Sequence, residues 1–78
     1  MKKGEFIKKL LDALESEDTN VDETTPLKQI KGYDSLGVLS IIAMVDKHFG
    51  VKIAGKEVVS LNTIQDLIDK IGRNKIDG

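Results

Sequence analysis

Hydrophobic residues recur at helical spacing in three separate segments of this chain. The first segment runs from about Lys3 to Glu15, with apolar residues three or four positions apart and charged residues on the other side. Its apolar positions are Phe6, Ile7, Leu10, Leu11 and Leu14. This pattern predicts an amphipathic helix that packs one face against a core.

The second segment, Ser35 to Phe49, is apolar on two sides. One stripe consists of Val38, Ile41, Ile42, Val45 and Phe49, and the other consists of Leu36, Leu39 and Ala43. Asp34 or Ser35 can cap the start of the helix, and Gly50 supplies a left-handed stop. Gly37, in the first turn, costs about 0.5–1 kcal/mol relative to alanine, which favours a mobile helix end. A helix with two apolar sides is central to a fold or partly exposed for a partner, and the pattern is compatible with both.

The third helical segment follows a short connection. Val51 to Ile53 is too short to build a sheet and is expected to be extended, and Gly55 to Ser60 allows one or two helical turns. Asn62 and Gln65 match the N-cap and N3 positions of a capping box, and Gly72 lies near the expected stop. The apolar positions between them are Ile64, Leu67, Ile68 and Ile71. The sequence therefore predicts one all-α domain over residues 1–78, a bundle of three longer helices and one short helix.

A long loop separates the first two helical segments and is acidic. Its five acids, with no base among them, are Glu15, Glu17, Asp18, Asp22 and Glu23. The run lacks the glycine and the regular alternation of a calcium loop, so it predicts a solvated loop and no metal site. Leu27 and Ile30, near its end, are expected to anchor the loop to the core.

Composition narrows the class of protein. Seventy-eight residues build one small core, and 12 basic against 13 acidic residues give a net charge of -1, which offers little attraction for nucleic acid. The chain has no cysteine, and charged residues interrupt every apolar run that could form a signal peptide or membrane span. We expect a soluble, cytoplasmic monomer that binds neither nucleic acid nor membranes.

Ser35 is the residue with the most conspicuous candidate chemistry. The only histidine, His48, lies 13 residues further along the same predicted helix, roughly 20 Å away at 1.5 Å per residue. A nucleophile elbow needs glycine two residues before the serine, and Tyr33 holds that place. Catalysis by Ser35 is therefore not expected, and the sequence predicts no catalytic residue. A hydroxyl at a helix N-terminus can instead cap the helix or receive a phosphodiester.

The stretch "GYDSLGVLSIIAMVDKHFGVKI" resembles the signature of acyl carrier proteins. The shared features are Gly-x-Asp-Ser-Leu, an apolar helix closing with phenylalanine, and a short extended link ending in isoleucine. The order of helices and the long loop extend the resemblance over nearly the whole chain. It implies a four-helix carrier whose Ser35 bears 4′-phosphopantetheine, taken from coenzyme A, with acyl groups held on the terminal thiol as thioesters.

The resemblance also implies roles for other positions. Ser35 matches the attachment site, and Asp34 matches the acid before it, a helix cap and a contact for the phosphopantetheinyl transferase. Partner recognition is expected at Tyr33, Leu36, Leu39 and Ala43. A cleft that shelters acyl chains is expected to be lined by Ile41, Val45, Ile53, Val58 and Leu61. Each cleft position would also be apolar in an ordinary core. The implied partners are the transferase and enzymes that load, transfer or condense acyl groups.

One departure from the family concerns the second helix, which is typically acidic in carriers of fatty-acid synthesis. Here it holds one acid, Asp46, offset by Lys47, and Gly37 and Ser40 stand where carboxylates are common. This difference favours a specialised carrier for polyketide, peptide or cell-surface biosynthesis at least as much as a general fatty-acid carrier. Two alternatives stay open: a non-catalytic helical interaction module in which Ser35 is only a helix cap, and a carrier-like domain that is never modified.

Overall fold

The protein forms a small bundle of helices. The computed structural model describes residues 1–77, and within them the elements are α1 (Lys3–Ala13), η1 (Leu27–Gln29), α2 (Ser35–Phe49), α3 (Gly55–Val59) and α4 (Ile64–Ile71). η1 is a short 3₁₀ helix, and the described residues contain isolated bridges but no strand. The predicted all-α architecture of three longer helices and one short helix is confirmed.

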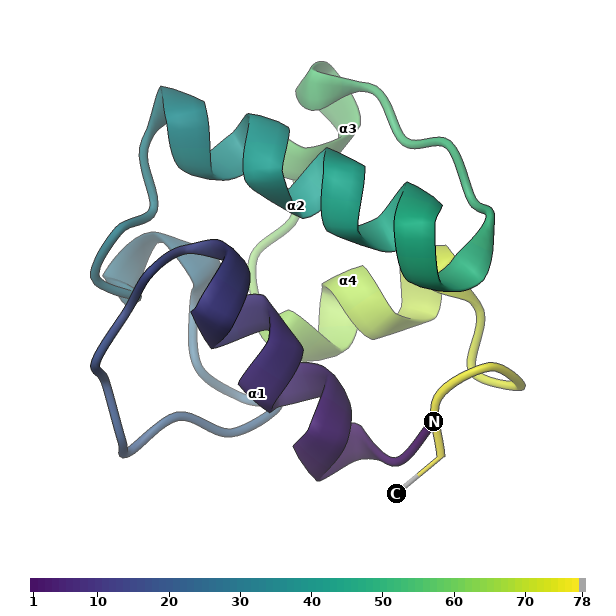
Figure 1. Ribbon diagram of the computed structural model, residues 1–78, viewed down its shortest axis with the longest axis horizontal. Coiled ribbons are helices and arrows are strands. Elements are labelled where there is room, and N and C mark those ends of the chain that lie inside the picture. The colour runs from purple at the N-terminus through teal and green to yellow at the C-terminus, as the bar shows by residue number, and fades with distance from the viewer. Residues whose placement is uncertain (78) are drawn as a thin grey trace.

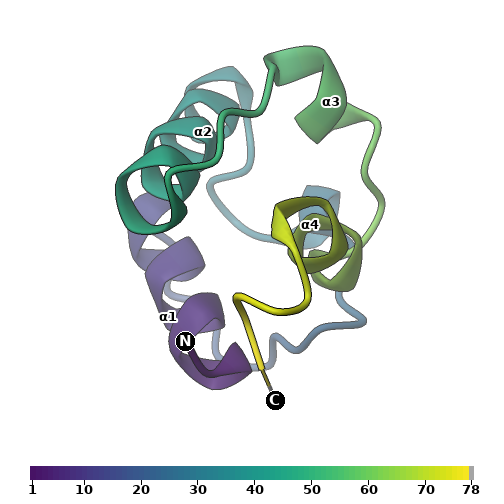
Figure 2. The same cartoon turned by 90° about the vertical axis from the view of Figure 1, so that its right-hand side faces the viewer.

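The helices enclose one core. Figure 2 shows α1 and α2 on one side of the molecule and α3 and α4 on the other. The side chains buried between them are Phe6, Leu10, Leu14, Leu27, Ile30, Val38, Ile41, Met44, Val45, Ile53, Val58, Ile64, Leu67, Ile68, Ile71 and Ile76. Leu27 and Ile30 are among them, so their predicted role as loop anchors is confirmed. No helix between residues 1 and 77 has the length and apolar character that crossing a bilayer requires.

Helix α1 ends earlier than its apolar pattern predicts. The helix stops at Ala13, because Glu15 takes a left-handed conformation with φ 54°. The backbone N–H of Ser16 then donates to the carbonyl of Leu11 at 2.9 Å, a bond that satisfies a carbonyl left open at the helix end. Leu14 lies outside the helix but is buried, so the prediction that it packs against the core is confirmed.

Helix α2 has the predicted bounds and the predicted stop. Asp34 is its N-cap, with Oδ1 accepting a hydrogen bond of 2.8 Å from the backbone N–H of Gly37. Gly50 follows the helix in the left-handed region at φ 67°. Val38, Ile41 and Val45 are buried, whereas Leu36 and Leu39 are 74% and 61% exposed. The two apolar stripes therefore face different surroundings, one the core and one solvent.

Gly37 is packed tightly at the start of α2. A Cβ built on Gly37 would lie 2.6 Å from the carbonyl oxygen of Gly32 and 2.9 Å from Leu14 Cδ2. Gly32 has φ 95°, and a Cβ there would meet the carbonyl oxygen of Leu14. The backbone of this loop thus approaches the first turn of α2 and the end of α1 too closely for a side chain. Tertiary packing accounts for the glycine at position 37, and the mobility of this helix end stays a prediction.

The capping box of α4 lies one residue later than predicted. Thr63, not Asn62, is the N-cap, and its Oγ1 accepts from the backbone N–H of Asp66 at 3.2 Å. Asp66 Oδ2 in turn accepts from the backbone N–H of Thr63 at 3.1 Å. Asn62 instead uses its carbonyl to accept from the N–H of Leu27 at 2.8 Å, and Gln65 hydrogen-bonds to Asp69. The hydrogen bond between Asn62 and Leu27 joins Asn62 to the end of the long loop, and the N-cap is the next residue, Thr63.

The acidic loop and the chain ends are fastened to the bundle. The backbone N–H groups of Ile64 and Gln65 donate to the carbonyls of Thr25 and Glu23, which ties the loop to the start of α4. Asp18 Oδ2 accepts from the N–H of Lys31 at 2.8 Å. The N-terminus and the segment after α4 lie side by side in both views (Figure 1) and are joined by an isolated bridge.

Candidate functional site

Ser35 occupies the first position of α2 and is exposed to solvent. Because the Asp34 carboxylate caps the helix, the Ser35 hydroxyl is not needed for capping. Within residues 1–77 the structure records no hydrogen bond to Ser35 Oγ. This arrangement contradicts the alternative in which Ser35 is only a helix cap. The hydroxyl is instead displayed at a helix end where backbone N–H groups favour a negatively charged substituent.

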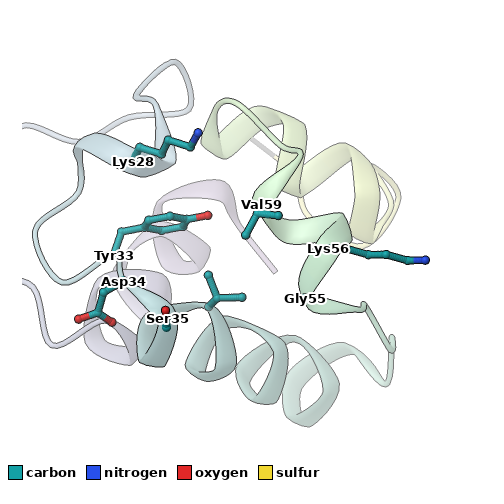
Figure 3. A pocket seen from close by; sticks show the side chains of 8 residues that line it. Lys28, Tyr33, Asp34, Ser35, Gly55, Lys56 and Val59 are labelled. Carbon is teal, nitrogen blue, oxygen red and sulfur yellow. The ribbon is translucent and has the colours of Figure 1, made fainter.

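An open cavity of about 610 Å³ lies beside Ser35, between the start of α2 and α3 (Figure 3). Its lining residues are Lys28, Tyr33, Asp34, Ser35, Val38, Gly55, Lys56 and Val59. We call this cavity the Ser35 groove. In Figure 3 the Tyr33 ring extends across it toward Val59, and the Lys28 head group lies on the same side as the Tyr33 oxygen, while Lys56 points away. The groove therefore combines an apolar surface with hydrogen-bond donors next to the serine.

Tyr33 is partly buried, and its hydroxyl has no hydrogen-bond partner. Tyr33 packs against the core cluster, and its Oη is shielded from solvent with no acceptor or donor among residues 1–77. Burial disfavours the phenolate and so raises the pKa of Tyr33. Tyr33 therefore differs from the other residues predicted for partner recognition, because its polar atom is shielded from solvent.

The other predicted recognition residues do lie on the surface. Leu36, Leu39 and Ala43 are exposed along α2, and Val59 on α3 is 51% exposed. Leu36, Leu39 and Val59 are the large apolar side chains most exposed among the described residues. They come from the two helices that border the Ser35 groove, so apolar surface continues outward from the site. The sequence predicted the exposed α2 positions but not Val59. Helix α3 is only five residues long, so the spacing of its apolar residues does not indicate which of them is exposed.

Comparison with known proteins places this site in a family. A model of the phosphopantetheine attachment site family matches residues 5–71. An acyl carrier protein of Myxococcus xanthus is 36% identical over 61 residues, which cover 72% of this chain and 77% of the relative. An acyl carrier protein of Micrococcus luteus is also 36% identical over 61 residues, covering 72% of this chain and 75% of the relative. No solved structure gave a significant match.

This chain belongs to the acyl carrier protein family. Members of this family bear 4′-phosphopantetheine as a covalently attached prosthetic group and interact with phosphopantetheinyl transferases and acyl-processing enzymes. The residues of this carrier fit such a group, because an exposed hydroxyl without a hydrogen bond opens on a groove to which Tyr33, Val38 and Val59 contribute apolar surface. Once attached, the group supplies a thiol that holds an acyl chain as a thioester.

The five residues predicted to line an acyl cleft lie deeper than the Ser35 groove. Ile41, Val45, Ile53 and Val58 are buried in the core, and Leu61 packs against it. None of the five lines the groove. An acyl chain would reach them only if α2 and α3 moved apart, because their side chains are already packed against one another. Their role as a cleft stays a prediction, and the surface open beside Ser35 is provided by Val38 and Val59.

Proposed function

We propose that Ser35 is the attachment residue of this acyl carrier protein and that the domain presents thioester-bound acyl groups to separate enzymes. The observation that carries the proposal is the division of roles at the start of α2, where Asp34 caps the helix and Ser35 displays a hydroxyl. In the attachment step the serine oxygen forms a new bond to phosphorus and loses its proton, and the nucleotide part of coenzyme A leaves.

The transferase, and not the carrier, supplies the catalytic groups in this proposal. His48, the only histidine, is exposed at the opposite end of α2 from Ser35, so it does not act on the serine as a base. The Asp34 carboxylate is exposed beside Ser35 and caps the helix, and in this proposal it also contacts the transferase. Acyl-loading, acyl-transfer or condensing enzymes would then approach over Leu36, Leu39 and Ala43.

We further propose a dedicated biosynthetic pathway for this carrier. Asp46, the only acid of α2, is paired with Lys52 at 3.3 Å between Nζ and Oδ2. Lys47, the other charged residue of the helix, lies at its C-terminal end beside His48. A basic enzyme surface that recognises an acidic helix would therefore make few favourable charge contacts with α2. This supports polyketide, peptide or cell-surface biosynthesis over general fatty-acid synthesis.

Intact mass spectrometry tests the attachment site. The protein is incubated with coenzyme A and a phosphopantetheinyl transferase of broad specificity. We expect the wild type to gain the mass of one phosphopantetheinyl group and Ser35→Ala to gain none. Ser40→Ala, which removes a hydroxyl one helical turn and a half further along α2, is the matched control and should be modified like the wild type. Modification of Ser35→Ala, or an unmodified wild type, would overturn the assignment.

A further inference from the structure

A furrow runs between α1 and α2, on the other side of α2 from the Ser35 groove. Helix α2 lies between α1 and α3 (Figure 2). At one end of the furrow the centroid of the Phe6 ring, near the start of α1, lies 5.9 Å from that of Phe49, the last residue of α2. At the other end Gly37 packs against Leu14, just after α1. The two helices that border the furrow therefore run in opposite directions.

Two hollows make up this furrow. One, of about 500 Å³, lies toward the C-terminal end of α2, and the other, of about 200 Å³, lies toward its start. Ala13 lines both hollows, so they meet at this residue, and we call the pair the α1–α2 furrow. Its uncharged lining includes Ala13, Leu36, Ser40, Ala43 and Met44. Small side chains in the middle thus leave space between the two helices.

The charged residues of the furrow are separated by sign. Glu15 and Asp34 line the hollow at the start of α2. Lys9 and Lys47 line the other hollow from opposite walls, and Asp12 offsets one of these two charges. The ion pairs recorded within residues 1–77 involve none of these five side chains. The furrow therefore offers a partner one acidic end, one basic end and a less polar middle.

We infer that the α1–α2 furrow binds an amphipathic helix of another protein. Carboxylates in the first turn of that helix lie against Lys9 and Lys47, and basic residues in its last turn lie against Glu15 and Asp34. Acids at the start of a helix and bases at its end complement the backbone dipole, so the furrow matches the side-chain polarity that helices favour. The bound helix runs antiparallel to α2, and its apolar ridge fills the space over the small side chains.

A second copy of this chain complements the furrow in charge but not in shape. A two-fold axis would place the acidic end of one copy against the basic end of the other. Both copies would then present Ser40 and Ala43 to each other, and two hollowed faces leave a gap that forfeits dispersion contacts. A foreign helix supplies the ridge that the furrow lacks.

Two synthetic helical peptides test this inference. Both are about 14 residues long, roughly 20 Å at 1.5 Å per residue, and are stapled by a lactam because free peptides of this length are marginally helical. The acid-first peptide has glutamates in its first turn, lysines in its last turn and a leucine–alanine face, and the base-first peptide exchanges glutamates and lysines. NMR titration of the unmodified carrier measures both affinities, so the result does not depend on attachment at Ser35. We expect the wild type to bind the acid-first peptide about 2–10-fold more tightly, since each exposed charge pair contributes little.

Reversing the furrow should reverse this preference. Glu15→Lys combined with Lys47→Glu exchanges the charges of the two ends and leaves the net charge unchanged. This variant should favour the base-first peptide, which separates charge matching from any difference in helix stability between the peptides. Glu17→Lys combined with Lys75→Glu is the matched control and should keep the wild-type preference, because both residues are exposed and neither lines the furrow.

Chemical shifts show where the peptide binds. The amide signals of Ala13 and Ala43 should move on binding, while Val59 on α3 serves as the reference. The inference is overturned if neither peptide binds, if the reversed variant keeps the wild-type preference, or if the shifts gather around Val59. Sedimentation of the carrier alone tests self-association. A wild-type dimer that Lys47→Glu dissociates would assign the furrow to a second copy and would also overturn the inference.

Discussion

At the start of α2, two glycines allow the chain to approach the end of α1 closely. Gly32 has a positive φ, and Gly37 has so little space that a Cβ would come within 2.6 Å of the Gly32 carbonyl oxygen and 2.9 Å of Leu14 Cδ2. The same turn carries Asp34 and Ser35, so the position of the serine depends on these contacts. Backbone packing at single residues thus sets the geometry of the site.

Gly37→Ala should destabilise the protein, although alanine has the higher helix propensity. The added methyl group overlaps backbone and must displace the loop, so we expect a loss of about 1–3 kcal/mol in the free energy of unfolding. Urea titration followed by circular dichroism measures the change. Gly4→Ala is the matched control, since Gly4 lies in α1 and a Cβ there would meet no side chain and no backbone from outside its own helix within 4 Å, and it should stabilise by about 0.5–1 kcal/mol. A stabilised Gly37→Ala would contradict the close packing.

At the level of elements, α2 presents one apolar stripe to the core and another to solvent. Leu36→Ala should change stability little, because the side chain is 74% exposed. If Leu36 anchors a partner enzyme, the same substitution should weaken binding to that enzyme by about 1–3 kcal/mol, measured by titration calorimetry. Ser40→Ala on the same helix is the control. Unchanged affinity of Leu36→Ala for every enzyme that processes the loaded carrier would remove Leu36 from the recognition surface.

Partner binding to α2 should also depend weakly on salt. Asp46 is neutralised by Lys52, and exposed charges at physiological ionic strength are already screened over about 8 Å. Affinity for a cognate enzyme is measured between low and about 1 M salt. The acidic loop is the competing docking surface, and Asp18 and Asp22 hold its backbone through hydrogen bonds. The informative variant therefore changes Glu15, Glu17 and Glu23 to glutamine. A steep salt dependence that this variant abolishes would move docking from α2 to the loop.

Across the whole molecule, stability rests on one small core. Ile68 on α4 is 1% exposed and packs within the core cluster. Ile68→Ala should cost about 2–5 kcal/mol, a large part of the stability of so small a domain. The measurement is the urea midpoint, with Leu36→Ala as the exposed counterpart. Equal losses at both positions would show that α2 buries its second stripe in solution.

Acid should weaken the contact between α3 and α4. The hydrogen bond from Lys70 Nζ, at 2.6 Å, and then that from the backbone N–H of Ala54, lower the pKa of Glu57. A carboxyl whose pKa is lower in the folded state stabilises the fold above its unfolded pKa, and this contribution is lost as the pH falls through the folded value. The hydrogen bond from Arg73 likewise lowers the pKa of Asp69, so the contribution of Asp69 to stability is also lost in acid.

We therefore expect the urea midpoint to fall as the pH drops below about 4–4.5, the ordinary range for carboxyl groups. Glu57→Gln should flatten this decline, because its amide does not titrate. Glu17→Gln makes the same charge change away from the contact between α3 and α4 and is the control. An equal decline in Glu57→Gln and wild type would show that the Glu57–Lys70 pair contributes nothing measurable.

The sequence by itself determined the helices, the family and the candidate serine. Apolar residues at helical spacing specify which face of a helix avoids water, and this information is local, so α2 was predicted with its bounds. The exposure of its second apolar stripe was implied by the family resemblance and not by the spacing. The sequence pattern predicted the residues that end or begin a helix less accurately. Either Asn62 or Thr63 can start a capping box, and only the pairing of Asn62 with Leu27 in the folded chain selects Thr63.

Tertiary structure decided the features that depend on residues distant in the sequence. The space around Gly37 exists only where the loop meets Leu14, and no helix propensity describes it. The surface open beside Ser35 is shaped by α3 and η1, so Val59 and Lys28 line the site, whereas the deeper apolar residues lie in the core. The isolation of the Tyr33 hydroxyl likewise follows from burial by segments far along the chain, because hydrogen-bond partners are set by proximity in space and not by order in sequence.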